Sequence, residues 1–143
     1  MLRRGMFLLP LLVSGLACGG DSTSPGQEVT IDGSFFMVEM ADQPLPFTYD
    51  FGDGELERTT GGSLAITGTR FTLAIAFSES DDNGLTWQAN GMTEPGSFTL
   101  SGSSVTFIFD SDRDPFTGTW DGADEIEVQG LYGGAILSGL FRR

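Results

Sequence analysis

The chain lacks histidine and lysine altogether and contains a single cysteine. Without histidine, neither a Ser/His/Asp set nor a Cys/His pair can be assembled, and the commonest general base and metal ligand is missing. Carboxylate pairs alone can hydrolyse glycosides, but 20 acidic residues make such pairs inevitable, and no spacing singles one out. We therefore expect a protein that is not an enzyme and uses no cofactor.

Positive charge is also scarce. The seven basic residues are all arginine, against 20 acidic residues, and the net charge is −13. Binding to nucleic acid requires a basic face, so nucleic acid is excluded as a partner. Attraction to anionic lipid is disfavoured for the same reason. The acidic charge is typical of a domain kept in solution by mutual repulsion, and affinity for cations is the alternative reading.

No apolar run is long enough to span a bilayer as a helix, which takes about 20 residues. The longest lies near the N-terminus, where Arg3 and Arg4 precede an apolar stretch over 6–13. Small residues follow, ending in Leu16-Ala17-Cys18, and this is the layout of a secretory signal. A cysteine at that place resembles the lipobox of bacterial lipoproteins. The resemblance implies cleavage before Cys18, a diacylglycerol on its thiol and an acylated amino group; the alternative is an ordinary signal with a chance cysteine.

The chain accordingly divides into a signal peptide over 1–17, a tether over 18–31 and one domain over 32–143. Residues 19–27 contain no aliphatic or aromatic side chain and are rich in Gly, Ser and Pro, as flexible linkers are. With Cys18 lipidated, no disulfide is available. Gly19 follows the cysteine, where Asp would resemble an inner-membrane retention signal. We therefore expect a lipid anchor in the cell envelope, in the outer membrane of a Gram-negative bacterium.

The domain is predicted to be all-β. Side chains alternate in polarity most clearly over 70–78, and no window shows a helical period. Turn signals separate the other apolar runs at short spacing, one of them at Glu94-Pro95-Gly96. Strands are expected at 34–40, 46–51, 57–67, 70–78, 98–100, 105–109, 126–128 and 136–141. An antiparallel meander of about eight to ten strands closes most easily into an up-and-down barrel; a β-sandwich is the alternative.

The same alternation predicts the core. Inward-facing apolar side chains should fill a small barrel, leaving at most a shallow pocket at one mouth. The residues expected in this core are Phe71, Leu73, Ile75, Phe77, Phe98, Leu100, Val105, Phe107 and Phe109.

Short motifs in the chain resemble those of two protein families. Gly33-Ser34-Phe35-Phe36, the run over 96–107 and Phe116-Thr117-Gly118-Thr119-Trp120 resemble the small lipocalin-like domains of bacterial lipoproteins, which implies a barrel and no particular activity. Tyr49-Asp50-Phe51-Gly52-Asp53-Gly54 is similar to a signature of PKD-type Ig-like domains, which would imply an adhesive or structural sandwich. We interpret this hexapeptide as an acidic hairpin turn.

Two sets of residues are candidates for binding. Trp87 and Trp120 could line an apolar cavity at a barrel mouth, although core packing is the commoner role of such residues. Asp110, Asp112 and Asp114 stand at alternate positions, a spacing that can direct oxygen ligands at Ca²⁺, although an ordinary loop would carry them as well. The prediction for function is therefore a membrane-anchored envelope lipoprotein that binds a small apolar ligand or an envelope protein. A PKD-type module, with or without calcium, is the alternative.

Overall fold

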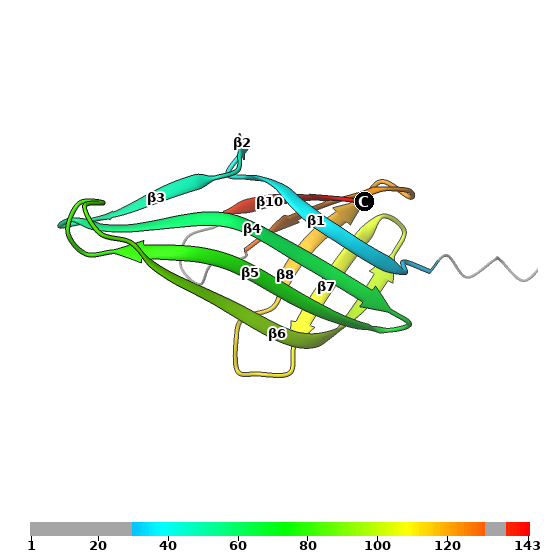
Figure 1. The fold of residues 1–143 in the computed structure, drawn as a ribbon. Helices are drawn as coiled ribbons and strands as arrows, with labels where there is room; N and C mark the ends of the chain where they lie inside the picture. Colours follow the sequence, from blue (N-terminus) through cyan, green and yellow to red (C-terminus); the bar gives the residue numbers. More distant parts are fainter. Residues whose placement is uncertain (1–29, 131–136) are drawn as a thin grey trace, which may run out of the picture.

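The computed structural model describes residues 30–130 and 137–143, and they form one antiparallel sheet of ten strands. No described helix is long and apolar enough to cross a membrane. Most strands pair with their neighbours in sequence, so the connections are hairpins (Figure 1). The strands are β1 (Gly33–Met40), β2 (Gln43–Pro44), β3 (Phe47–Gly52), β4 (Glu55–Thr67), β5 (Arg70–Ser80), β6 (Gln88–Ser101), β7 (Ser104–Phe109), β8 (Phe116–Trp120), β9 (Glu125–Gln129) and β10 (Ser138–Arg142).

The sheet closes through β1, which pairs with two strands. Its first half pairs with β4, from Gly33 opposite Ile66 to Phe36 opposite Ser63, and its second half pairs with β10. The ring then runs through β9, β8, β7, β6 and β5 back to β4, so that eight strands form a closed up-and-down barrel. The predicted barrel is confirmed, and the PKD-type sandwich considered as its alternative is not the fold.

Side chains fill the barrel interior. Phe107 stacks on Phe116, with ring centroids 4.5 Å apart and planes 8° from parallel, and Phe71 meets both rings edge-on. Of the core residues expected from the sequence, seven are buried, while Phe77 and Leu100 are only partly buried. Buried hydrophobic residues outside that expectation are Ile31, Phe35, Met37, Met40, Leu64, Ile66, Phe116, Trp120, Ile126, Val128 and Phe141.

The longest strand, β6, corrects the sequence analysis, which placed a turn at Glu94-Pro95-Gly96. All three residues lie inside β6. Pro95 is tolerated because β6 pairs with β7 only from Gly96 onward, so no β7 carbonyl lies where the N–H of residue 95 would point. The Pro95 carbonyl accepts a hydrogen bond from the Asp110 N–H at 3.0 Å. Gly96 is needed for close packing, since a β-carbon there would overlap the ring of Phe71 and the carbonyl of Ile108.

Three strands, β4, β5 and β6, are longer than the barrel requires, and together with β3 they form a projection that we call the arm. It comprises β3, the part of β4 from Glu55 to Thr59, the part of β5 from Phe77 to Ser80, and the part of β6 from Gln88 to Thr93. A β-bulge between Thr59 and Gly61 marks where β4 leaves the barrel. Figure 1 shows the arm reaching well beyond the short strands β7 to β10.

The described chain begins at the barrel end opposite the arm. Arg143 Nη2 donates a hydrogen bond to the Asp32 carbonyl, and the Arg143 guanidinium lies over the Phe35 ring, 4.6 Å from its centroid. Ile31, which the sequence analysis assigned to the tether, is fully buried, so the core begins one residue before the predicted domain boundary. Cys18 and the signal sequence lie outside the described residues.

Candidate functional site

The tip of the arm is a turn organised by Ser80 and Asp82. Ser80 is 6% exposed, and its hydroxyl accepts the Gly84 N–H at 2.9 Å while donating to Asp82 Oδ1 at 2.8 Å. The carboxylate of Asp82 also accepts the Thr86 N–H at 2.9 Å and the Thr86 hydroxyl at 2.6 Å. These bonds, above all the one from the Thr86 hydroxyl, lower the pKa of Asp82 to about 2. The turn over Asp81-Asp82-Asn83-Gly84 is thus a charged cap held by side-chain hydrogen bonds.

Trp87 lies against this cap. The guanidinium of Arg58 stacks over its ring, 3.9 Å from the centroid, and its indole N–H donates to the Gly84 carbonyl at 3.0 Å. A β-carbon at Gly84 would lie 3.3 Å from both Leu56 and Trp87, which shows how closely these groups pack. Trp87 is therefore a structural residue of the arm whose polar atom is already bonded.

An open hollow of about 460 Å³ lies beside the cap. Its apolar walls are Phe51, which is 57% exposed, and Leu56. The ring of Phe51 meets Tyr49 edge-on, with centroids 4.7 Å apart, so the exposed ring has a fixed neighbour. Carboxylates form the rim, and the lining residues are Phe51, Glu55, Leu56, Glu57, Glu79, Ser80, Asp81, Thr86 and Gln88.

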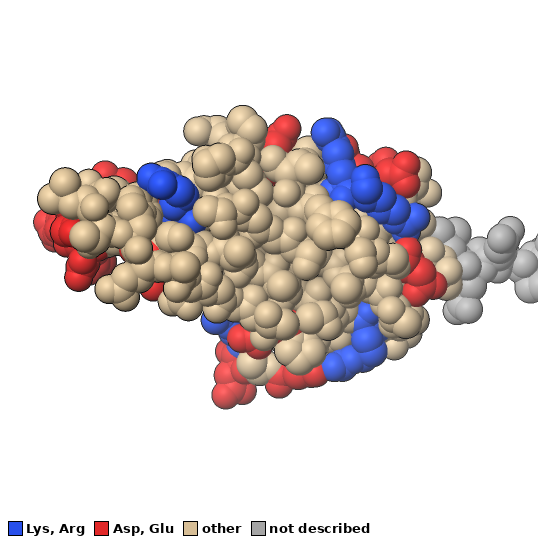
Figure 2. All heavy atoms as spheres, in the orientation of Figure 1, with Lys and Arg blue, Asp and Glu red and all other residues tan. Residues whose placement is uncertain are grey.

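The two ends of the molecule differ in charge. Figure 2 shows acidic side chains gathered on the arm tip, whereas the end where the described chain begins carries both blue arginine and red acidic side chains. On the arm, Arg58 is the single base among the described residues, and it is stacked on Trp87. The hollow is therefore an apolar surface in a negative field, suited to a partner that carries both apolar and cationic groups.

The structure places the two tryptophans predicted to bind ligand at opposite ends. Trp87 precedes β6 at the arm, whereas the Trp120 N–H donates to the Ser103 carbonyl in the turn that follows β6. Trp120 is 7% exposed, and its indole N–H points to the Ala123 carbonyl at 3.4 Å. The two residues do not line one cavity, although Trp87 flanks the hollow of the arm through its neighbours Thr86 and Gln88.

Two side chains of the loop considered for calcium binding form ion pairs with other residues. Both oxygens of Asp110 accept hydrogen bonds from the guanidinium of Arg70, which lowers the pKa of this carboxyl. Arg113, inside the same loop, bonds through Nε to Glu94 at 3.1 Å. Across residues 30–130 and 137–143, no three acidic side chains are placed to hold a metal ion. Asp110, Asp112 and Asp114 are thus not brought together as ligands.

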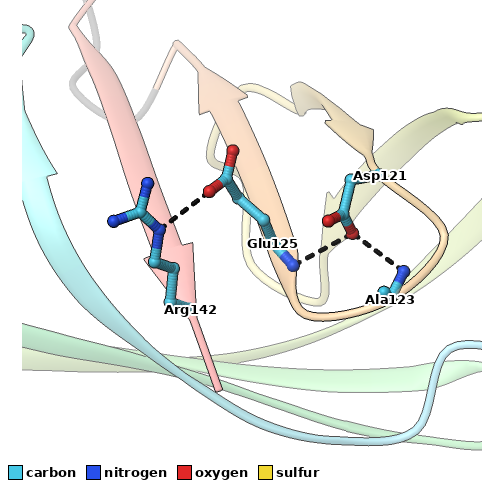
Figure 3. A network of polar contacts seen from close by, with 4 residues as sticks. All are labelled: Asp121, Ala123, Glu125 and Arg142. Carbon is cyan, nitrogen blue, oxygen red and sulfur yellow. Dashed lines mark hydrogen bonds and ion pairs between the residues drawn. The ribbon is translucent and has the colours of Figure 1, made fainter.

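A polar network fixes the barrel end far from the arm (Figure 3). Asp121 Oδ1 accepts the N–H groups of Ala123 and Glu125 at 2.8 and 3.0 Å, which lowers the pKa of Asp121. The side chain of Glu125 in turn pairs with Arg142 Nε at 2.8 Å. These bonds hold the β8–β9 turn to β10. They satisfy one another within the barrel wall, so this network is structural.

The sequence predicts the hairpin turn and several of the strand segments that form the arm, but it does not predict that they project from the barrel. The sequence analysis interpreted Tyr49 to Gly54 as a hairpin turn, and this is confirmed, because β3 ends at Gly52 and β4 begins at Glu55. The arm was not predicted because Pro95 and Gly96 were interpreted as a turn, so β6 was not predicted as one long strand. Comparison of the chain with protein-family models, with curated proteins and with solved structures found no match.

Proposed function

We propose that this chain is a non-enzymatic, lipid-anchored lipoprotein of the cell envelope whose lipocalin-like barrel is a scaffold for a partner-binding arm. The anchor part of the proposal is supported by the signal layout ending in Leu16-Ala17-Cys18. The arrangement of the two ends of the molecule also supports it, because the described chain begins at the barrel end opposite the arm. A barrel tethered there would present the arm away from the membrane.

One observation carries the choice of the arm as the working surface. The positions that line a ligand cavity in a larger barrel are occupied here by packed rings, among them Phe71, Phe107 and Phe116. A ligand in the lumen would have to displace buried side chains, each contributing roughly 1.5–3 kcal/mol by its burial. The arm, by contrast, already offers an open hollow with an exposed aromatic ring. A protein segment with apolar and basic side chains fits this surface.

A small apolar or amphiphilic ligand is the second candidate for the same hollow. A volume of about 460 Å³ falls within the usual range for small-molecule sites, and Phe51 and Leu56 supply apolar walls. The carboxylate rim favours a ligand with a cationic head group over a fatty acid.

The test of partner binding is site-specific photocrosslinking on the anchored chain. A photoreactive phenylalanine analogue at Phe51 should yield an adduct of one defined mass, and Asp81→Lys should weaken that adduct by reversing the rim charge. The matched control carries the analogue at Phe36, which is 58% exposed on the barrel wall. Equal adducts from both positions would contradict the proposal.

Fatty-acid titration distinguishes the arm from the lumen. A Trp87→Phe variant leaves Trp120 as the only indole reporter, at the mouth opposite the arm. We expect its fluorescence to stay unchanged on titration. Stoichiometric submicromolar binding with a change in Trp120 emission would reveal a lumen cavity and overturn the scaffold reading. The anchor is tested separately, since a Cys18→Ser chain should no longer partition with membranes.

A further inference from the structure

Strand β6 has a free edge along the arm. It pairs with β5 from Gln88 opposite Glu79 to Ser97 opposite Arg70, but with β7 only from Gly96 to Ser101. Among the described residues, no strand pairs with the other side of β6 from Gln88 to Thr93. An unpaired strand edge is a template on which another strand can add.

The direction of the backbone groups on this edge follows from one hydrogen bond. The Pro95 carbonyl accepts the Asp110 N–H, so it faces away from β5. The register with β5 contains no bulge, and backbone groups alternate in direction along a strand. The N–H and C=O groups of Ala89, Gly91 and Thr93 therefore also face away from β5. In agreement, the Gly91 N–H is bonded to the side chain of its neighbour, Asn90 Oδ1, at 2.8 Å.

The unpaired edge of β6 runs from Gln88 to Pro95, and its protection against pairing is confined to Glu94 and Pro95 beside the barrel. Natural edge strands carry charges, prolines or bulges. The other edge of the arm, β3, has all three: Pro46 precedes it, Asp50 lies within it, and a bulge separates Asp50 from Gly52. Residues 88–93 of β6 have none, in a chain with 20 acidic residues. The small residues Ala89 and Gly91 also leave the backbone uncovered.

The same segment is complementary to itself. If two copies meet antiparallel on a two-fold axis at Gly91, then Ala89 lies opposite Thr93 of the second copy, and Gln88 lies opposite Glu94. No carboxylate faces a carboxylate in this register. The acidic arm tips point in opposite directions, and each approaches the side of the other copy where Arg113 binds Glu94. The loop that carries Arg113 also carries Asp112 and Asp114, so charge supplies no net attraction, and the pairing rests on the uncharged side chains of residues 88–93.

We propose that two copies of this chain associate by antiparallel pairing of the β6 edges, centred on Gly91, so that the two arms form one continuous sheet. The Asn90 side chain gives up its bond to the Gly91 N–H when the second strand arrives. The apolar walls of the hollow, Phe51 and Leu56, lie on β3 and β4, away from the β6 edge. Of its lining residues only Gln88 belongs to β6 and would lie in the contact.

Disulfide trapping in the membrane-anchored full chain tests this register. The native chain has a single cysteine, Cys18, so a cross-link that forms only after a second cysteine is introduced reports the new thiol. Ala89→Cys and Thr93→Cys are made singly in two differently tagged chains and co-expressed. Mild oxidation should give a covalent dimer that contains both tags, because residues 89 and 93 face each other across the axis. Each single variant alone should give several-fold less.

The matched control places cysteines at Thr72 and Ala76, which have the same spacing and exposure but lie on β5 between two paired strands. Co-expressed Thr72→Cys and Ala76→Cys chains should not cross-link. Dimer formation from the control as strong as from the edge pair would overturn the proposal, as would absence of the mixed dimer. All four substitutions replace exposed side chains, and unchanged thermal unfolding of each variant verifies that the barrel is intact.

Discussion

Phe71 packs across Gly96 on the neighbouring strand, and its ring occupies the space that a β-carbon at residue 96 would need. The pair joins β5 and β6, two of the strands that extend from the barrel into the arm. Phe71 also meets Phe107, Phe109 and Phe116 edge-on, so the glycine allows one ring to hold the centre of the core. The close approach explains why a glycine, a poor strand residue in general, stands in the middle of β6.

Gly96→Ala should therefore destabilise the fold. The added methyl group meets the rigid Ile108 carbonyl as well as the Phe71 ring, and overpacking of this kind costs about 1–3 kcal/mol. Urea unfolding followed by tryptophan fluorescence measures the loss. The control is Gly61→Ala, where nothing lies within 4 Å of the new β-carbon, and this variant should be neutral or slightly more stable. Equal effects at both positions would contradict the packing argument.

Strand polarity made the barrel predictable, since the alternation over 70–78 marks one buried face and short turns leave few topologies for a meander. The length of β6 was not predictable in the same way. Pro95 and Gly96 are turn signals by composition, and only tertiary context shows that the proline sits where pairing with β7 begins and the glycine under Phe71. Local propensity was overridden by packing.

The same limit applies to the site. Phe77 continues the alternation of Phe71, Leu73 and Ile75, so sequence places it in the core, yet it lies where β5 leaves the barrel and is only partly buried. Periodicity reports which face a side chain occupies but not whether another layer covers that face. The hollow on the arm exists because no further layer covers that face of the strands. Trp87 and Trp120 were predicted to share a cavity because both are tryptophans, yet Trp87 precedes the 14 residues of β6 and Trp120 lies at the other end of that strand.

A second prediction uses this contrast between barrel and arm. Phe107→Ala removes a fully buried ring that stacks on Phe116, and it should lower the free energy of unfolding by roughly 3–5 kcal/mol. Phe77→Ala removes an identical ring from the root of the arm and should cost clearly less. Chemical denaturation of the two variants under one condition makes the comparison. Similar losses would mean that the arm and barrel share one core.

Chelation should leave stability unchanged. Asp110 is bonded to Arg70, and the described carboxylates include no group of three that could hold a metal ion. We expect the thermal midpoint of the chain to be the same with and without EDTA, measured by circular dichroism. A marked fall that calcium reverses would contradict this and return Asp110, Asp112 and Asp114 to consideration as ligands.

The cap of the arm should respond to acid through Asp82. Its folded-state pKa of about 2 lies below the ordinary aspartate value of 3.8, because Thr86 and Ser80 donate hydrogen bonds to the charged form. A depressed pKa contributes stability that is fully present above the unfolded value and is lost as the pH falls through the folded one. Asp82→Asn should therefore be less stable than the native chain at neutral pH, and the gap should close between about pH 4 and pH 2. The carboxamide keeps an acceptor for the Thr86 N–H, so the turn itself should survive.

The neighbouring substitution Asp81→Asn serves as the control for this experiment. It removes the same charge from the same turn but breaks none of the bonds from Ser80 or Thr86. Thermal unfolding of the native chain and both variants across this pH range separates the two contributions. A gap for Asp82→Asn that persists unchanged at pH 2, or one that Asp81→Asn reproduces, would show that general charge repulsion and not this set of hydrogen bonds governs the acid response of the arm.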